Sequence, residues 1–419
     1  MSAYERLDAW VEANFEAEVE FLRALVRVST ATPPGDNAPN AALAAELLEG
    51  FGLAVERHEV SGDEVRRQGM ESITNLIVRR RYAVGPIVAL NAHGDAVPAG
   101  EGWTHDPYGA EIVDDRLYGR GAAVNKSDFA TFTFALRALE SLGATLHGGI
   151  DLLLTYDEEF GGELGPEWLL ARGLTRPDLL IAAGMSHQVV TAHNGCLQLE
   201  VSVIGRQAHA AIPDTGVDAL RGANAILTAL YQRNDEYQKI TSKVVGIHHP
   251  YINIGRIDGG VNTNVVPGRV VLKLDRRMIP EEDPTAVEVE MRKLIEDAAH
   301  SVPGVAVALR RLLLDQQWRP TAANGALVAL LQRHGEVVLG EPIPALGTPL
   351  YTDVRLFAAR GIPAAIYGAG PRGVADSNAK RGDEHLVLSD LKAATRVVAR
   401  TLYDLLGPDA RPEVRASGR

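Results

Sequence analysis

Short apolar runs that end in polar residues constrain the fold of this chain more than any other feature. Three such runs occupy residues 74–78, 87–90 and 150–154. Their length and lack of alternation are typical of strands buried on both faces of a largely parallel sheet. Apolar residues at helical spacing accompany them at 4–28, 40–51 and 129–142. The alternation predicts an α/β fold, with a mixed, mostly parallel sheet and helices on both faces.

The pattern changes in the middle of the chain. Apolar residues begin to alternate at Gly195, and the segment to residue 310 reads strand, helix, strand, strand, helix, strand. This is the order of a split ferredoxin-like unit. The α/β pattern then resumes, and 419 residues are enough for two cores. We therefore predict an α/β domain at 1–194 and 311–419, interrupted by a compact α+β ferredoxin-like domain at 195–310.

Charge and composition narrow the classes of partner. The net charge of −12 argues against nucleic acid, because nucleic-acid binders concentrate Lys and Arg at phosphate contacts. No segment is long and apolar enough to span a bilayer, and residues 1–15 lack the order of a secretory signal. The single cysteine, Cys196, cannot form an internal disulfide. A cytoplasmic protein without a membrane or nucleic-acid partner is expected.

A histidine and an aspartate directly follow one of the buried strands. Residues 91–95 read Asn-Ala-His-Gly-Asp, which places His93 and Asp95 at the carboxyl end of the strand, where α/β sheets bind ligands. Such a histidine can bind metal while the carboxylate holds its other ring nitrogen. A hydrogen-bonded core histidine is an equal alternative from this run alone.

Three consecutive carboxylates follow another buried strand. Residues 155–162 read Thr-Tyr-Asp-Glu-Glu-Phe-Gly-Gly. Placing two glutamates together at a strand end costs free energy unless a cation compensates their charge. One can bind metal while its neighbour acts as general base toward a metal-activated water. A solvated acidic loop is the alternative.

Together these segments resemble the M20 aminoacylase/carboxypeptidase family, and the resemblance covers essentially the whole chain. The main matching segments are 92–95 (Ala-His-Gly-Asp), 117–122 (Leu-Tyr-Gly-Arg-Gly-Ala), 205–210 (Gly-Arg-Gln-Ala-His-Ala), 264–267 (Asn-Val-Val-Pro), 353–355 (Asp-Val-Arg) and 368–371 (Gly-Ala-Gly-Pro). The resemblance implies that His93 and Glu159 bind metal, that Asp95 orients His93 and that Glu158 is the general base.

The resemblance also implies that residues 1–194 and 311–419 form a catalytic, metal-binding domain and that residues 195–310 form a lid or dimerisation domain. His209 and Asn264 would reach the substrate from the lid of a partner subunit in a homodimer or higher homo-oligomer, with His209 helping to stabilise an oxyanion. Arg277 is a candidate for binding a substrate carboxylate. A salt bridge with Asp275 is its equally favoured alternative.

The chain departs from the family at three of five expected metal ligands. Val124 stands where an aspartate bridges two metals, Met185 lies near an expected glutamate, and Lys380 replaces a closing histidine. A site that loses ligands binds metal more weakly. We therefore predict one labile divalent transition metal, such as Mn, Zn or Co, and assign Lys380 to substrate binding, with a solvated surface lysine as the alternative. Candidates for extra coordination are Asn125, Asp128, His187, Asp376, Asn378 and His385.

The altered ligand set is similar to what we expect of one branch, the nitroanthranilate aminohydrolases of aromatic degradation. The sequence thus predicts a metal-dependent hydrolase of a carbon–nitrogen bond in a small carboxylate-bearing substrate. Its most specific form converts 5-nitroanthranilic acid to 5-nitrosalicylate and ammonia. An N-acyl-amino-acid amidohydrolase, dipeptidase or carboxypeptidase is the first alternative, and a non-catalytic binding protein on the same fold is the second.

Overall fold

The computed structural model describes residues 1–373, 375–408 and 410. It divides into two compact units, one comprising Met1–Thr191, Pro320–Leu346 and Thr352–Arg419 and the other Ala192–Arg319 and Gly347–Tyr351. The second unit begins before residue 195 and ends after residue 310. These wider bounds arise because the backbones of His193 and Trp318 exchange two hydrogen bonds of 3.1 Å, which join the two ends of this unit.

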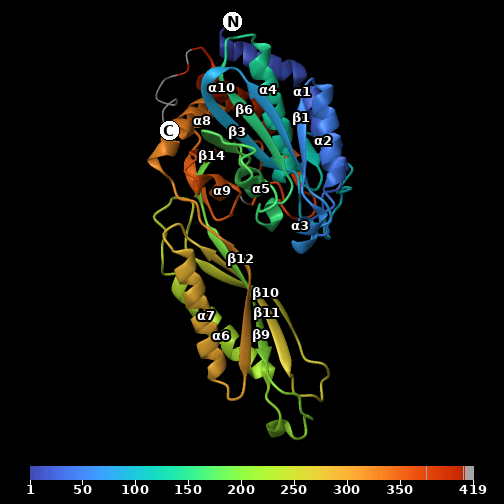
Figure 1. Cartoon of the computed structure of the whole chain (residues 1–419), viewed down its shortest axis with the longest axis vertical. Coiled ribbons are helices and arrows are strands. Elements are labelled where there is room, and N and C mark those ends of the chain that lie inside the picture. The colour runs from blue at the N-terminus through green and yellow to red at the C-terminus, as the bar shows by residue number, and fades with distance from the viewer. Residues whose placement is uncertain (374, 409, 411–419) are drawn as a thin grey trace. The chain divides into compact units, whose positions relative to one another are not determined.

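An eight-stranded mixed sheet forms the centre of the first unit (Figure 1). Its strand order is β1-β2-β6-β3-β7-β14-β8-β13. The central strands β6, β3, β7 and β14 pair in parallel, whereas β1, β2 and β8 join antiparallel. The bounds are β1 Val55–Glu59, β2 Thr74–Arg81, β3 Ala83–His93, β6 His147–Thr155, β7 Leu179–Ala182, β8 Val189–His193, β13 Ala345–Thr348 and β14 Ala364–Ile366. The predicted α/β fold with parallel central strands is confirmed.

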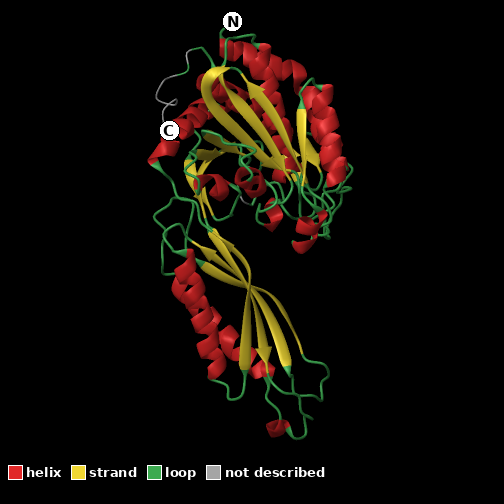
Figure 2. Cartoon of the chain, viewed as in Figure 1, coloured by secondary structure: helices red, strands yellow, loops and turns green. Residues whose placement is uncertain are grey.

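Helices pack against this sheet and against one another (Figure 2). The longer ones are α1 Ala3–Arg27, α2 Ala38–Gly50, α4 Ser127–Ser141, α8 Gly325–Leu339 and α10 Leu388–Leu406. The shorter ones are α3 Gly62–Arg67, η1 Ala122–Lys126, η2 Glu158–Phe160, α5 Pro166–Ala171, η4 Ala322–Asn324 and α9 Val354–Ala358. A separate small sheet contains β4 Glu111–Val113, β5 Arg116–Tyr118 and β15 His385–Val387. None of the helices in the described part of the chain has the length and apolarity to cross a bilayer.

The second unit has the predicted ferredoxin-like order. It contains β9 Gly195–Ile204, η3 Pro213–Thr215, α6 Ala219–Tyr237, β10 Tyr251–Gly259, β11 Arg269–Met278, α7 Pro284–His300 and β12 Ala306–Asp315. The four strands form an antiparallel sheet in the order β10-β11-β9-β12. In β9, Leu197, Leu199 and Val201 are buried under α6 and α7, which explains the alternation seen in the sequence.

One buried carboxyl group in the first unit leads to a prediction about stability. Glu18 of α1 is fully buried; its Oε1 accepts a 2.5 Å hydrogen bond from Thr395 of α10, and its Oε2 has no partner among the described residues. Burial raises its pKa to about 8. The unfolded chain therefore binds fewer protons than the folded chain between about pH 4.5 and 8, so the free energy of unfolding falls as pH rises through this window.

We expect Glu18→Gln to remove this penalty. Its Tm should exceed that of the wild type by roughly 5 °C at pH 8, with a much smaller difference at pH 4.5. Thermal unfolding at both pH values measures the effect, with Glu16→Gln on the exposed side of α1 as the control. An equal Tm difference at the two pH values would contradict the assignment of a buried, protonated Glu18.

Candidate active site

The end of β3 positions a histidine and the carboxylate that orients it. His93 is the last residue of the strand, and its Nδ1 lies 3.2 Å from Asp95 Oδ1. Asp95 is fully buried and accepts hydrogen bonds from the backbone N–H groups of Glu158 and Glu159, at 3.3 and 3.0 Å. Asp95 thus joins the end of β3 to the segment that follows β6, and it leaves Nε2 of His93 as the nitrogen available to a ligand.

The neighbouring strand supplies two glutamates. β6 pairs in parallel with β3, with Thr155 opposite His93, so the short helix η2 begins beside the histidine. Glu158 Oε2 lies 3.8 Å from His93 Nε2, and its side chain is 14% exposed. Four predicted residues, His93, Asp95, Glu158 and Glu159, are therefore brought together at the carboxyl ends of two adjacent parallel strands.

Burial and charge act in opposite directions on these groups. Burial lowers the pKa of His93, but Glu158 and the hydrogen bond to Asp95 outweigh it and raise that pKa to about 10. Burial raises the pKa of Glu158, and the neighbouring Glu159 adds to this effect while His93 opposes it. A raised pKa makes the Glu158 carboxylate a stronger proton acceptor, as a general base requires.

Asp353 is a further carboxylate beside Glu158 to which the sequence analysis gave no role. It is buried, and burial together with the charges of Glu158 and Asp157 raises its pKa. Arg355, two residues on, donates to the carbonyl oxygen of Gly161. This interaction holds the turn after η2 against the first turn of α9. The Asp-Val-Arg run at 353–355 was the only sequence signal for this contact.

Lys380 is also part of the cluster, although it lies more than two hundred residues after Glu159. Its Nζ is 2.6 Å from Glu159 Oε2, and the side chain is 51% exposed whereas that of Glu159 is 7% exposed. Burial alone would lower the pKa of Lys380, but Glu159 and Glu158 raise it. The ammonium group therefore stays protonated and covers Glu159 from the solvent side. Lys380 is exposed on a loop, as the alternative of a solvated surface lysine expected, but its ammonium group has a partner in Glu159.

The described residues do not form a site for a pair of metal ions. No group of three or more His, Cys, Asp or Glu side chains in the described ranges is arranged to hold an ion. Met185 is buried, and its sulfur accepts a 2.6 Å hydrogen bond from Gln188. Valine at 124 offers no donor atom. His93 and Glu159 stay the two predicted ligands, and an ion held by them alone would need water and substrate to complete its coordination.

Most of the residues that the sequence offered for extra metal coordination are hydrogen-bonded or paired to other protein groups. Asp128 is fully buried and accepts hydrogen bonds from the backbone of Gly184 and Ala369, at 2.9 and 2.7 Å. His187 lies 3.2 Å from Asp390. Asn378 donates to the carbonyl oxygen of Asp383, and His385 Nδ1 also lies beside that oxygen. By contrast, Asn125 is buried and its Oδ1 has no hydrogen-bond partner in the described residues.

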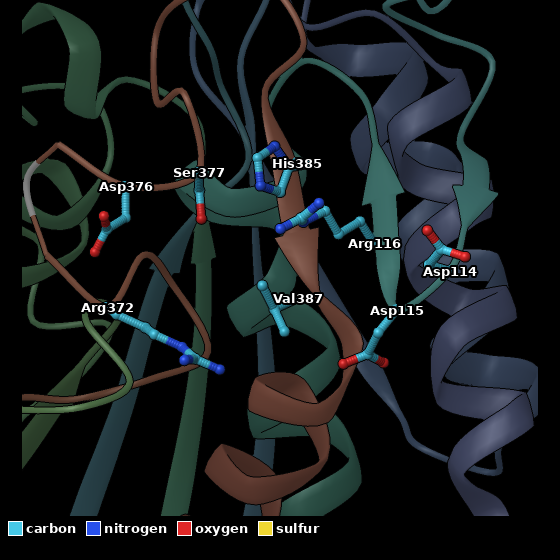
Figure 3. Close-up of a pocket in the computed structure, with 8 residues that line it drawn as sticks. All are labelled: Asp114, Asp115, Arg116, Arg372, Asp376, Ser377, His385 and Val387. Carbon is cyan, nitrogen blue, oxygen red and sulfur yellow. The ribbon is translucent and has the colours of Figure 1, made fainter.

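Asp376 and His385 line a separate pocket of about 450 Å³ in the first unit. Figure 3 shows Arg116 and Arg372 reaching toward the middle of this pocket from opposite sides. Arg372 is already held by Asp390, through contacts of 2.7 and 2.9 Å. The lining of this pocket includes neither His93 nor Glu159. Asp376 and His385 therefore gain no support as additional metal ligands.

The remaining predicted residues belong to the second unit. His209 and Asn264 are exposed and lie on adjoining loops, because His209 forms a bridge with Val265 and the amide of Ala210 donates to the carbonyl oxygen of Asn264. Arg277 Nε lies 2.6 Å from Asp275 Oδ1, so the salt bridge weighed against substrate binding is present. The roles of all three in substrate binding stay predictions.

Comparison with known proteins gives a consistent result. The sequence profile described as peptidase family M20/M25/M40 matches residues 89–404. A succinyl-diaminopimelate desuccinylase from Gluconacetobacter diazotrophicus is 29% identical over 398 residues, covering 92% of this chain and 96% of the relative. An acetylornithine deacetylase from Myxococcus xanthus is 28% identical over 385 residues, covering 88% and 93%. A Bacillus subtilis protein described as a dinuclear metal binding peptidase shares the fold, with a TM-score of 0.66, 16% identity and coverage of 94% and 99%.

Proposed function

This chain belongs to peptidase family M20/M25/M40 and is a hydrolase of carbon–nitrogen bonds, and we propose that its substrate is a small N-acylated amino acid or related carboxylate. The observation that carries the proposal is the cluster of His93, Asp95 and Glu158 at the ends of β3 and β6. The names of the desuccinylase and deacetylase relatives support the substrate class.

The proposed chemistry assigns a different task to each residue. Glu158 takes a proton from the attacking water and returns it to the departing nitrogen. Asp95 fixes the ring of His93. The family is metal-dependent, and in this chain His93 and Glu159 would hold one divalent transition metal, labile and of Mn, Zn, Co or similar identity, which when bound supplies Lewis acidity.

We further propose that the second unit contributes through a homodimer or higher homo-oligomer. His209 and Asn264 of a partner subunit would stabilise the developing oxyanion, and Arg277 would bind the substrate carboxylate after exchanging its contact with Asp275. The strands β10 and β12 support pairing between copies, because each is an edge of the four-stranded sheet in the described part of the chain. Buried Cys196 as the single cysteine fits a cytoplasmic location.

Hydrolysis of an aromatic amine is the second candidate, with 5-nitroanthranilic acid as its specific form. It is favoured by the loss of donor atoms at Val124 and Met185. A substrate that carries a carboxylate and an amine side by side could supply missing ligands. An electron-poor ring would also accept the attacking oxygen with less help from the protein.

A substrate panel separates these candidates. We expect purified protein supplied with Mn²⁺, Co²⁺ or Zn²⁺ to release amine from N-succinyl or N-acetyl amino acids, measured by amine-reactive fluorescence. Ammonia release from 5-nitroanthranilate without acyl-substrate turnover would favour the second candidate. Tight binding of these compounds with no turnover under any of the metals would instead identify a binding protein and contradict the proposal.

A further inference from the structure

We propose that Lys380 is a resident cation of the active site and competes directly with a metal ion for Glu159. The contact that carries this proposal is the 2.6 Å ion pair between Lys380 Nζ and Glu159 Oε2. Glu159 is one of the two residues proposed above to hold an ion, the other being His93. An ion can therefore use Glu159 fully only when the ammonium group withdraws.

The loop that presents Lys380 is held firmly in place. Asp383 accepts hydrogen bonds from Thr104 through both the amide nitrogen and Oγ1, each at 2.7 Å. Arg120 is buried, forms a 2.5 Å ion pair with Glu384, and donates to the carbonyl oxygen of Arg381 at 3.0 Å. Three residues that follow Lys380, namely Arg381, Asp383 and Glu384, thus attach the loop to the body of the first unit, so the backbone position of Lys380 is built into the fold.

The backbone of this loop is also strained. Four residues that are not glycine have positive φ, namely Ser377 (59°), Asn378 (49°), Lys380 (62°) and Asp383 (55°). This conformation is sterically disfavoured for residues with a Cβ, and such strain concentrates at functional sites. The chain maintains a disfavoured loop around the residue that carries the ammonium group, which supports a specific role for Lys380.

The charges of the cluster agree with this role. Glu158, Glu159 and Asp95 gather where the sequence lacks the other expected ligands, and without a metal these carboxylates repel one another. Lys380 faces Glu159 at 2.6 Å, so this glutamate already has a cation from the chain itself. The charge of Glu159 is therefore compensated before an ion enters. An entering ion gains less than it would at an uncompensated pair of glutamates.

Substrate can change this balance. Lys380 is half exposed, so its ammonium group can turn toward an anionic substrate without leaving a buried charge unpaired. A substrate carboxylate would attract Lys380 away from Glu159 and free that side chain for the ion. This step rests on the proposed function, whereas the competition between Lys380 and the ion does not require substrate.

Metal binding without substrate tests the inference. Isothermal titration of the full-length protein with Mn²⁺ should show that Lys380→Met binds the ion at least about tenfold more tightly than the wild type, because a positive charge beside the carboxylate is removed. Lys380→Arg, which keeps the charge, should bind as weakly as the wild type. Lys293→Met provides a matched control, since Lys293 forms an exposed 2.7 Å pair with Asp297 in the second unit.

The design keeps failure of this inference distinct from failure of the proposed function. Equal or weaker Mn²⁺ binding by a folded Lys380→Met would overturn the inference, even if acyl amino acids are hydrolysed. Tighter binding would support it, even if no substrate in the panel is turned over. Thermal unfolding checks that each variant is folded. If Lys380→Met does not fold, Lys380→Gln replaces it in the Mn²⁺ titration.

Discussion

Replacing Glu158 by Gln should lower kcat by about 100-fold or more while substrate binding is retained. Glutamine has nearly the same shape but cannot accept the proton of the attacking water, and general bases typically contribute about 10²–10⁴-fold. The side chain lies beside His93 Nε2, so its carboxylate faces the reacting region. Steady-state kinetics on the preferred acyl substrate and equilibrium binding of that substrate measure the two effects.

The neighbouring residues provide the control for this variant. Glu163 lies on the same loop, is exposed, and bonds only to Gln68 among the described contacts. Glu163→Gln should therefore keep wild-type kcat. If Glu158→Gln keeps more than about a tenth of the wild-type rate, Glu158 is not the general base. Glu159 is unsuited to that role because Lys380 engages its carboxylate.

The fold could be predicted because its signals are local. Apolar runs without alternation marked β2, β3 and β6, and the change to alternating residues marked β9 at the start of the second unit. Antiparallel pairing of β1 and β8 at the outer parts of the sheet could not be predicted, because it depends on how the chain returns to the sheet rather than on the residues of each strand.

The site was only partly accessible from the sequence. His93 and Asp95 are two residues apart and follow one strand, so their contact could be expected. The pair between Glu159 and Lys380 could not, because it joins distant segments through a loop that depends on Arg120 and on strained backbone. The position of Asp353 beside Glu158 is likewise a tertiary contact, which spacing along the chain does not encode.

Removal of metal should abolish most of the activity. No three His, Cys, Asp or Glu side chains in the described part of the chain are grouped to hold an ion, and Lys380 pairs with Glu159, one of the two proposed ligands. Such an ion exchanges readily, because a site with fewer and less charged ligands binds an ion more weakly. We expect brief dialysis against a weak chelator to remove at least about nine-tenths of the activity, and added Mn²⁺, Co²⁺ or Zn²⁺ to restore it.

The metal content of the dialysed protein tests the central claim most directly. That claim is a hydrolytic site that keeps Glu158 and His93 but has lost the pair of tightly held ions. Elemental analysis after dialysis should find well under one metal per chain in the wild type, with activity regained on titration toward about one equivalent. Two metals per chain that survive the same dialysis would contradict the claim, because the ligands at Val124, Met185 and Lys380 would then have replacements that the described residues do not contain.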